Sequence, residues 1–351
     1  LESEKPMNRL LQGDVGSGKT IVSIIAAYKV VKCGYQVAIM APTAILASQH
    51  LVNFKNILEP FGIRCELLIS KLTKKQKEAI LEKLKNGEID ILIGTHALLQ
   101  ENVEFKKLGF VVTDEQHRFG VKQRGIISSK GENPDVLVMT ATPIPRTLAL
   151  ILYGDLDISI MDELPPNRQT IDTFAVGEKM EDRVNTFIRK QVQEGRQCYM
   201  VCPLIEDNEE INAKSVMELA THYKEEVFPD LRVEYLHGKM KAKEKEEIMG
   251  AFKNGEIDIL ISTTVIEVGV DVPNATIMVI QNAERFGLAA LHQLRGRVGR
   301  GKYKSYCILK CGTLGENTKE RMKIMCETQD GFKIAEKDLE LRGSGEFFGT
   351  K

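Results

Sequence analysis

Short apolar runs alternate with longer amphipathic segments along the chain, and this alternation predicts a parallel α/β fold. Runs rich in β-branched residues are typical of buried strands, and they occur at 37–43, 110–115, 136–142, 198–205, 233–238 and 275–281. Strands of this kind belong to parallel sheets that helices cover on both faces. Functional side chains are then expected at the carboxyl ends of the strands.

The sequence KNGEIDILI occurs twice, at 85–93 and again 168 positions later (253 − 85) at 253–261. In each copy a charged amphipathic segment, 74–84 or 242–252, runs into an Asn-Gly turn and a strand. Nine identical residues in the same context predict two tandem lobes of similar fold.

The expected organisation is a first lobe over 1–165, a second lobe over 166–312 and a C-terminal extension over 313–351. The two prolines of LPPNRQT, 164–170, interrupt both periodicities and mark the hinge between the lobes. The strand pattern ends near Cys311. Residues 318–348 then read as a helix, a turn and a glycine-rich stretch.

Bulk properties limit the function classes. No apolar run approaches the ~20 residues of a membrane-spanning helix, and no signal peptide opens the chain. These features predict a cytoplasmic protein with no membrane partner. The net charge of −1 does not by itself attract nucleic acid, so such a contact has to come from local basic groups.

Seven cysteines, an odd number in a long chain, disfavour a disulfide framework. Two pairs, Cys198/Cys202 and Cys307/Cys311, share a spacing, but both lie in strand-like runs. Positions four apart on a strand share a face. We therefore interpret these pairs as buried packing residues rather than zinc ligands, which more often lie on turns.

Residues 13–20 read GDVGSGKT and follow the strand-like segment 7–12, which is the context of a phosphate-binding loop. Glycines let backbone N–H groups approach the phosphates, and the helix that starts near Lys19 adds its positive end. Lys19 is expected to contact the β- and γ-phosphates, and Thr20 to ligate Mg²⁺. The predicted cofactors are ATP and Mg²⁺, and the candidate nucleotide-binding residues are Gly13, Gly16, Ser17, Gly18, Lys19 and Thr20.

Two carboxylates lie at the end of the strand-like run 110–115. Asp114 is the expected second Mg²⁺ anchor, and Glu115 is placed to polarise the attacking water. An Asp-Glu pair alone is usually a solvated turn. Its position after a buried strand and downstream of a phosphate loop favours the catalytic interpretation.

Residues 293–301 read QLRGRVGRG. Arg297 and Arg300 are three apart on a predicted helix and would share a face, and the glycines would allow close approach between lobes. We interpret these arginines as fingers for the γ-phosphate, with Gln293 facing the same cleft. The alternative is a solvated or phosphate-contacting basic face, to which Arg295 is better suited.

Small polar residues follow several predicted strands. As a set they are candidates for hydrogen bonds to successive phosphates of a nucleic acid, without reading of its bases. Thr140 and Thr142 are candidates for linking the ATP site to a bound strand, although threonines at strand ends often only cap helices. His237 is more typical of a structural histidine than of a ligand. The candidate nucleic-acid contacts are Thr43, Thr95, His96, Thr263 and Thr264.

The order of these motifs resembles that of superfamily-two helicases and translocases. After the phosphate loop come APT (41–43), GTH (94–96), DEQH (114–117), TAT (140–142) and STTVIEVGVDVP (262–273). The variants DEQHRFGVKQR (114–124), ATPIPRTLAL (141–150) and AERFGLAALHQLRGRVGRG (283–301), with the tail 331–351, are similar to the RecG family of bacterial DNA helicases.

The resemblance implies two RecA-like lobes and an ATP-driven enzyme that acts on stalled replication forks and Holliday junctions. It assigns Gly269 and Asp271 to nucleotide binding. The tail resembles a translocation motif, a helical hairpin and loop that couples ATP turnover to movement along duplex DNA. The implied coupling residues are Gln116, His117, Thr140, Thr142, Arg321 and Arg342.

The resemblance also implies features of the whole protein. A junction-binding wedge domain and an adenine-recognition helix are expected ahead of Leu1, so we interpret the chain as a motor core. The expected partner is branched or duplex DNA, and the expected state is a monomer in the bacterial cytoplasm near the nucleoid.

Three alternatives stay open at this stage. One is a translocase of the related Mfd type, which acts on RNA polymerase. Another is a nucleotide-gated DNA-binding core that turns over little ATP without its N-terminal domain. An RNA helicase is also compatible with the core motifs, because backbone contacts barely discriminate unless the 2′-OH is read.

Overall fold

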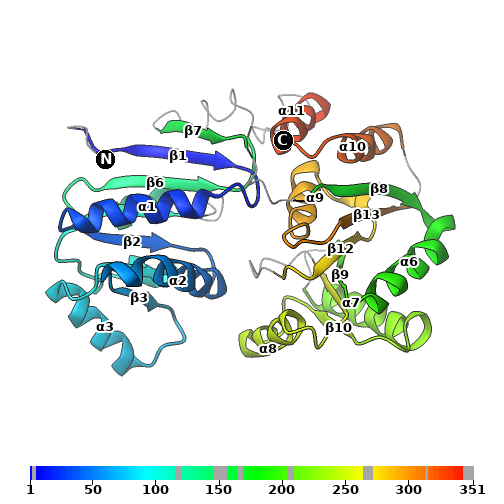
Figure 1. The fold of residues 1–351 in the computed structure, drawn as a ribbon, viewed down its shortest axis with the longest axis horizontal. Helices are drawn as coiled ribbons and strands as arrows, with labels where there is room; N and C mark the ends of the chain where they lie inside the picture. The colour runs from blue at the N-terminus through cyan, green and yellow to red at the C-terminus, as the bar shows by residue number, and fades with distance from the viewer. Residues whose placement is uncertain are drawn as a thin grey trace. The chain divides into compact units, whose positions relative to one another are not determined.

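The computed structural model describes residues 1, 5–114, 121–144, 156–163, 169–203, 209–263, 272–312 and 315–342 (Figure 1). The chain divides into two compact units, Leu1–Leu164 and Pro165–Lys351, each built on its own sheet. Several predictions fall outside the described residues: those on Glu115, Gln116, His117, Thr264, Gly269, Asp271, the side chain of Arg342 and most of the hinge.

Unit 1 contains a parallel sheet of seven strands in the order β3-β4-β2-β5-β6-β1-β7. The strands are β1 (Asn8–Gly13), β2 (Gln36–Met40), β3 (Cys65–Leu68), β4 (Ile91–Gly94), β5 (Leu108–Thr113), β6 (Asp135–Thr140) and β7 (Asp157–Met161). The helices are α1 (Lys19–Lys32), α2 (Ala44–Leu58), α3 (Lys74–Asn86) and α4 (Val121–Ser128).

The first sheet is covered on both faces. Val37 and Ile39 of β2 pack in one cluster with residues of α1 and α2, among them Phe54. Ala38, the residue between them, packs in a second cluster with Leu84 of α3. Successive side chains of a strand point to opposite faces, so a strand buried on both sides has to be apolar at every position. The prediction of a helix-covered parallel sheet is confirmed.

Unit 2 contains a parallel sheet of six strands in the order β10-β11-β9-β12-β13-β8. The strands are β8 (Ile171–Gly177), β9 (Gln197–Cys202), β10 (Val233–Leu236), β11 (Ile259–Thr263), β12 (Ala275–Ile280) and β13 (Ser305–Cys311). The helices are α6 (Glu181–Gln193), α7 (Glu209–His222), α8 (Ala242–Lys253), α9 (Leu288–Arg295), α10 (Glu316–Glu327) and α11 (Gly331–Arg342).

The two sheets share one topology. The order β3-β4-β2-β5-β6-β1 of unit 1 corresponds strand by strand to β10-β11-β9-β12-β13-β8 of unit 2, with β7 added at one edge of unit 1. The repeated KNGEIDILI segments lead into β4 and β11, which hold equivalent places. The repeat therefore belongs to two lobes of the same fold, as the sequence predicted.

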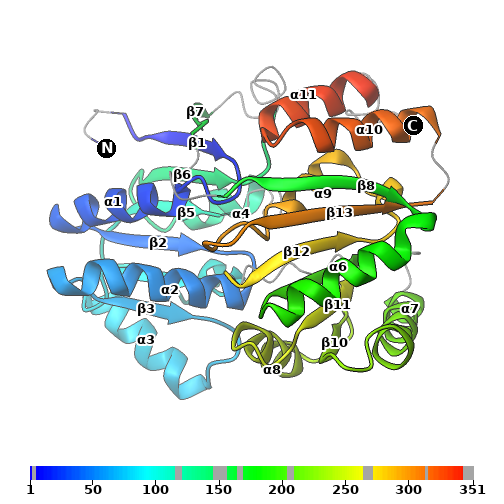
Figure 2. The same cartoon turned by 45° about the vertical axis from the view of Figure 1, so that its right-hand side comes forward.

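The tail begins with two helices that are part of unit 2. Helices α10 and α11 pack against each other, and both lie beside α9, with α10 also contacting β8 (Figure 2). The predicted helix and turn of this region are present. Among the described residues, no helix combines the length and apolar character needed to cross a bilayer.

Candidate nucleotide and nucleic-acid sites

The phosphate loop connects β1 to α1 at the carboxyl edge of the first sheet. Gly16 and Gly18 have φ angles of 77° and 96°, in the left-handed region that glycine adopts without strain. The Asp14 carbonyl accepts a hydrogen bond from the Ser17 amide at 3.1 Å, which closes the turn. The loop therefore delivers the chain to the amino end of α1, where free N–H groups favour an anion.

Lys19 is held within this loop. Its Nζ donates to the carbonyl oxygens of Gly13 and Asp14 at 2.7 and 2.8 Å, and the residue is only 8% exposed. Ser17 Oγ is buried and has no hydrogen-bond partner among the described residues. A Cβ added at Gly13 would lie 2.6 Å from that oxygen. A buried ammonium, an orphaned hydroxyl and a cradle that a side chain would fill together fit a bound phosphate.

Asp114 follows β5 at the same edge of the sheet, as predicted. Its Oδ2 lies 2.8 Å from Nε2 of His50 on α2, and the two side chains are 15% and 6% exposed. Its backbone N–H donates to the carbonyl of Met40 at 2.9 Å, so the main chain is fixed by the neighbouring strand. Sequence reasoning did not select His50. A signal was available: Ala47 and Phe54, at helical spacing, are core residues, which places a histidine on the buried face of α2.

The strand-end threonines have different environments. Thr43 Oγ1 accepts from the Leu46 amide at 3.3 Å and caps α2, and Thr140 Oγ1 accepts from the Thr142 amide at 3.1 Å. Thr95 and Thr263 are buried, whereas His96 is exposed. The capping role weighed above is thus present at Thr43. Contact of these residues with nucleic acid stays a prediction.

The arginine segment of unit 2 corrects one expectation. Helix α9 ends at Arg295, so Arg297 and Arg300 do not share a helical face. Gly299 is left-handed, with a φ of 79°, and this turns the chain away from the helix. Within unit 2 the backbone also passes close to Gly301, where an added Cβ would lie 2.3 Å from the Pro273 carbonyl oxygen. The close approach between lobes stays a prediction. Arg300 Nε donates to the Gly296 carbonyl at 3.2 Å, and Gln293 is half-buried on α9.

Arg295 is neither a solvated nor a phosphate-contacting residue. It is 2% exposed, and its Nη1 donates to the carbonyls of Met325 at 2.7 Å and Thr328 at 2.9 Å. Its Nη2 lies 2.9 Å from His292 Nδ1, which has to accept because a guanidinium only donates. The residue ties the end of α9 to the end of α10. The expectation of a basic surface position was wrong because backbone carbonyls, which no sequence motif marks, satisfy this charge.

The carboxyl end of β8 is the topological counterpart of the phosphate loop, and an ion pair lies there. Glu181, the first residue of α6, accepts from Lys310 Nζ at 2.6 Å. The Lys310 side chain is 12% exposed. Burial by itself lowers the pKa of Lys310, but the hydrogen bonds and charges of Glu181 and Tyr223 together outweigh burial and hold the pKa above its ordinary value. Unit 2 thus has a paired cation where unit 1 has the phosphate loop.

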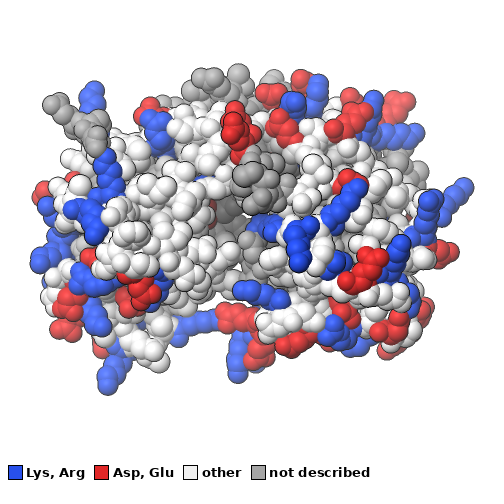
Figure 3. Space-filling model, in the orientation of Figure 1, with Lys and Arg blue, Asp and Glu red and all other residues white. Residues whose placement is uncertain are grey.

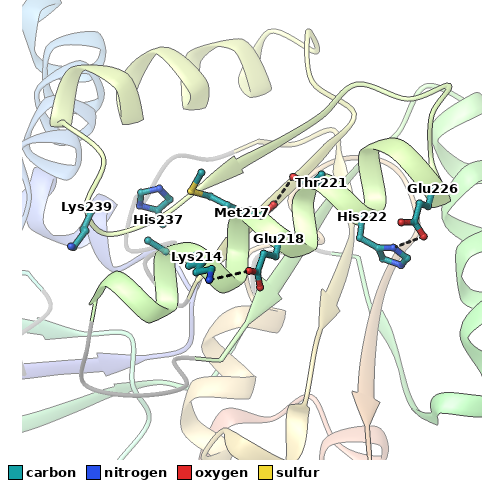
Figure 4. A pocket seen from close by; sticks show the side chains of 9 residues that line it. Lys214, Met217, Glu218, Thr221, His222, Glu226, His237 and Lys239 are labelled. Atoms are coloured by element: carbon teal, nitrogen blue, oxygen red, sulfur yellow. Dashed lines mark hydrogen bonds and ion pairs between the residues drawn. The ribbon is translucent and has the colours of Figure 1, made fainter.

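Two further predicted residues lie in unit 2. Arg321 is half-buried on α10, and its Nη1 donates to the Glu284 carbonyl at 3.4 Å. His237 stacks on Tyr235, with ring centroids 5.9 Å apart, and burial lowers the pKa of His237. It borders a hollow of about 700 Å³ that Met217 and Lys239 also line (Figure 4).

The cysteine pairs and the surface charges contribute less to the candidate sites than the residues above. Cys198, Cys307 and Cys311 are buried in β9 and β13, and burial raises the pKa of the Cys202 thiol to about 12. Within the described part of the chain, no group of three or more His, Cys, Asp or Glu residues could hold a metal. On the face shown in Figure 3, acidic and basic side chains are interspersed over both units.

Comparison with known proteins defines the class. Residues 2–151 match the DEAD/DEAH box helicase family, and residues 178–302 match the helicase conserved C-terminal domain. A phosphate-loop lobe followed by a second lobe of the same topology is a RecA-like helicase fold.

The particular family follows from the relatives. The chain is 52% identical to the ATP-dependent DNA helicase RecG of Bacillus subtilis, over 100% of this chain and 52% of that protein. It is also 52% identical to that of Thermotoga maritima, over 99% of this chain and 45% of that protein. Over its whole length the chain corresponds to the helicase core of the RecG family. It spans about half the length of these curated relatives.

Solved structures agree with this assignment. A structure of RecG bound to a three-way DNA junction aligns with a TM-score of 0.84 and 49% identity, covering 98% of this chain and 45% of the other. The RNA-bound helicase Mss116p aligns with a TM-score of 0.71 at 19% identity, which shows the common fold alone.

Proposed function

We propose that this chain is the ATP-driven motor core of an enzyme that moves along duplex DNA at branched structures, such as stalled forks and Holliday junctions. The observation that carries the proposal is the phosphate loop, in which buried Lys19 and left-handed Gly16 and Gly18 frame the amino end of α1. Relatives that share half of the sequence are ATP-dependent DNA helicases, and one of them was solved on a three-way junction.

Each group of the first lobe then has a role in phosphoryl transfer. Lys19 exchanges its loop carbonyls for the β- and γ-phosphates, and Ser17 and the backbone of the loop hold the phosphate chain. Thr20 and Asp114 hold Mg²⁺, which would neutralise charge on the phosphates. Glu115 orients the attacking water. Support comes from the positions of Lys19 and Asp114 at one edge of the sheet.

The second lobe supplies the remaining groups. Arg297 and Arg300 stabilise charge on the γ-phosphate, with Gln293, Gly269 and Asp271 at the same nucleotide. The segment that bears the arginines ends at Gly301, where the backbone passes so close to Pro273 that an added Cβ would lie 2.3 Å from its carbonyl oxygen.

Movement requires contacts that follow a phosphate backbone. The proposed contacts are Thr43, Thr95, His96, Thr263 and Thr264, which would hydrogen-bond successive phosphates without reading the bases. Coupling to ATP is assigned to Gln116, His117, Thr140 and Thr142 in the first lobe and to Arg321 and Arg342 in the tail. The near-neutral net charge of −1 makes such local contacts necessary.

Features of the whole protein belong to the same proposal. The lobes extend over 1–165 and 166–312, with a translocation motif over 313–351. In the complete protein we expect a wedge domain that engages the junction, a monomeric state and a cytoplasmic, nucleoid-associated location. The length of the relatives, about twice that of this chain, leaves room for such a domain.

The test is ATP hydrolysis by this chain with no DNA, with linear duplex and with a forked junction, and with Lys19→Ala as the blank. We expect a low basal rate that rises on duplex or forked DNA and falls to the blank in the variant. A basal rate indifferent to DNA would contradict a self-sufficient motor. Repetition with RNA would then separate a wrong substrate from a missing domain.

A further inference from the structure

His50 and Asp114 form a buried pair across 64 positions of sequence. Nε2 of His50 lies 2.8 Å from Oδ2 of Asp114, and the ring is in edge contact with Phe54, with centroids 6.4 Å apart. His50 lies on α2, and Asp114 is the first residue after β5, where its backbone N–H is hydrogen-bonded to the carbonyl of Met40 on the neighbouring strand.

The contact with His50 fixes the orientation of the Asp114 carboxylate, which the backbone leaves undetermined. The hydrogen bond from the Asp114 amide to Met40 sets the position of the main chain, but the carboxylate can still rotate about its side-chain bonds. An ionised carboxylate only accepts, so the ring donates from Nε2. Nδ1 of His50 is buried with no partner among the described residues, so the Asp114 bond alone orients the polar ring atoms.

A second histidine–carboxylate pair provides a contrast. His222 and Glu226 lie 3.1 Å apart on one helical face, but their side chains are 49% and 73% exposed. Water competes for both groups there, so the pair is weakly ordered. In the first lobe the side chains of His50 and Asp114 are only 6% and 15% exposed, so water competes far less for their hydrogen bond.

We propose that His50 is a positioning residue for the metal: it holds one oxygen of Asp114 so that the carboxylate meets Mg²⁺ in one orientation. The inference rests on the proposed role of Asp114 as a metal ligand. Partners that orient a ligating group typically contribute 10–100-fold in metal affinity. Loss of His50 is therefore expected to weaken the binding of the metal and to leave nucleotide binding without metal unchanged.

The experiment measures Mn²⁺ binding by electron paramagnetic resonance, with a non-hydrolysable ATP analogue at a fixed, saturating concentration. His50→Leu keeps the approximate volume and removes the donor, and we expect its dissociation constant for Mn²⁺ to rise about 10–100-fold. His50→Gln, whose amide nitrogen reaches the same oxygen, is expected to recover most of the affinity. Nucleotide affinity in EDTA should be the same in all three proteins.

Two further variants assign the cause. His222→Leu removes the exposed pair and should leave Mn²⁺ affinity unchanged. Asp114→Asn replaces one carboxylate oxygen of the proposed ligand by an amide nitrogen and removes its charge. If Asp114→Asn has no effect, the proposed metal role of Asp114 fails, and the inference fails with it.

If Asp114→Asn lowers the affinity for Mn²⁺ and His50→Leu does not, His50 is only a packing residue, while the proposed function stands. A His50→Leu protein that loses nucleotide affinity in EDTA to the same degree as Mn²⁺ affinity would also overturn the inference, because general damage to the lobe explains it.

Discussion

The two lobes carry the same contacts at the amino ends of their strands. Gln36 opens β2, and its amide donates to the carbonyls of Leu84 and Ile89 at 2.9 and 2.8 Å. Gln197 opens β9 and donates in the same way to the carbonyls of Phe252 and Ile257, at 2.6 and 2.7 Å. In each lobe this glutamine closes the turn that joins a helix to the following strand.

An ion pair repeats in the same way. Arg64 donates from its backbone, Nε and Nη2 to Asp90, and Arg232 donates from the same three groups to Asp258. The carboxyl ends differ, because unit 1 has the phosphate loop where unit 2 has Lys310 paired with Glu181. The shared contacts thus serve the fold, and the chemistry has diverged at the opposite edge.

The strongest test of that division is Arg300→Ala. If the second lobe contributes guanidinium groups and no cradle, hydrolysis should fall by about 10³–10⁵-fold while ATP binding persists, since a finger acts mainly on the transition state. Single-turnover hydrolysis and equilibrium binding of a fluorescent ATP analogue measure the two effects. Arg196→Ala, which removes an arginine stacked 3.2 Å from the centroid of the Tyr303 ring, is the matched control and should retain activity. Comparable turnover in both variants would refute the finger assignment.

A smaller effect is expected at Arg295, for which we find no counterpart in the described part of unit 1. Arg295→Met should lower the free energy of unfolding by about 3 kcal/mol, because two carbonyls lose a charged donor in a buried site. Chemical denaturation measures the change. Lys337→Met, which removes an exposed pair with Glu340, should leave stability unchanged. Equal changes in the free energy of unfolding at the two positions would contradict a stabilising role of the buried Arg295 hydrogen bonds.

The shared glutamines should respond alike. Gln36→Leu and Gln197→Leu each leave two buried carbonyls without their donor, and each should lower the free energy of unfolding of its lobe by about 2 kcal/mol. Denaturation of each variant, followed by hydrogen exchange at β4 and β11, locates the loss. A loss of stability in one lobe alone would contradict the equivalence of Gln36 and Gln197.

The ion pair provides the finest comparison. Burial by itself raises the pKa of Asp90, but the Arg64 hydrogen bonds hold it below its ordinary value. A depressed carboxylate pKa stabilises the fold above the unfolded pKa of about 4, and this contribution disappears as pH falls through the folded pKa. Arg64→Ala should therefore lower the free energy of unfolding by about 1 kcal/mol at pH 7, which is measured as a lower Tm. The difference between the variant and the parent should shrink progressively below pH 4. A deficit that persists unchanged at pH 3 would contradict this origin.

Most of the fold could be predicted from the sequence because its causes are local. Apolar strands, the repeated segment and the phosphate loop each depend on residues close in the chain. The failures have distant causes. Gly299 bends the chain after α9, where an added Cβ would meet Ile171 at 2.9 Å, and Arg295 is satisfied by carbonyls of a helix thirty positions away. His50 needed the knowledge that α2 lies against the end of β5.

The Arg295 tie also has a mechanical consequence. Its guanidinium joins the last residue of α9 to the carbonyls that end α10, and the chain leaves Arg295 directly into the segment that bears Arg297 and Arg300. Both hydrogen bonds come from one guanidinium nitrogen, so a shift of the end of α10 would also act on the end of α9, where the arginine segment begins.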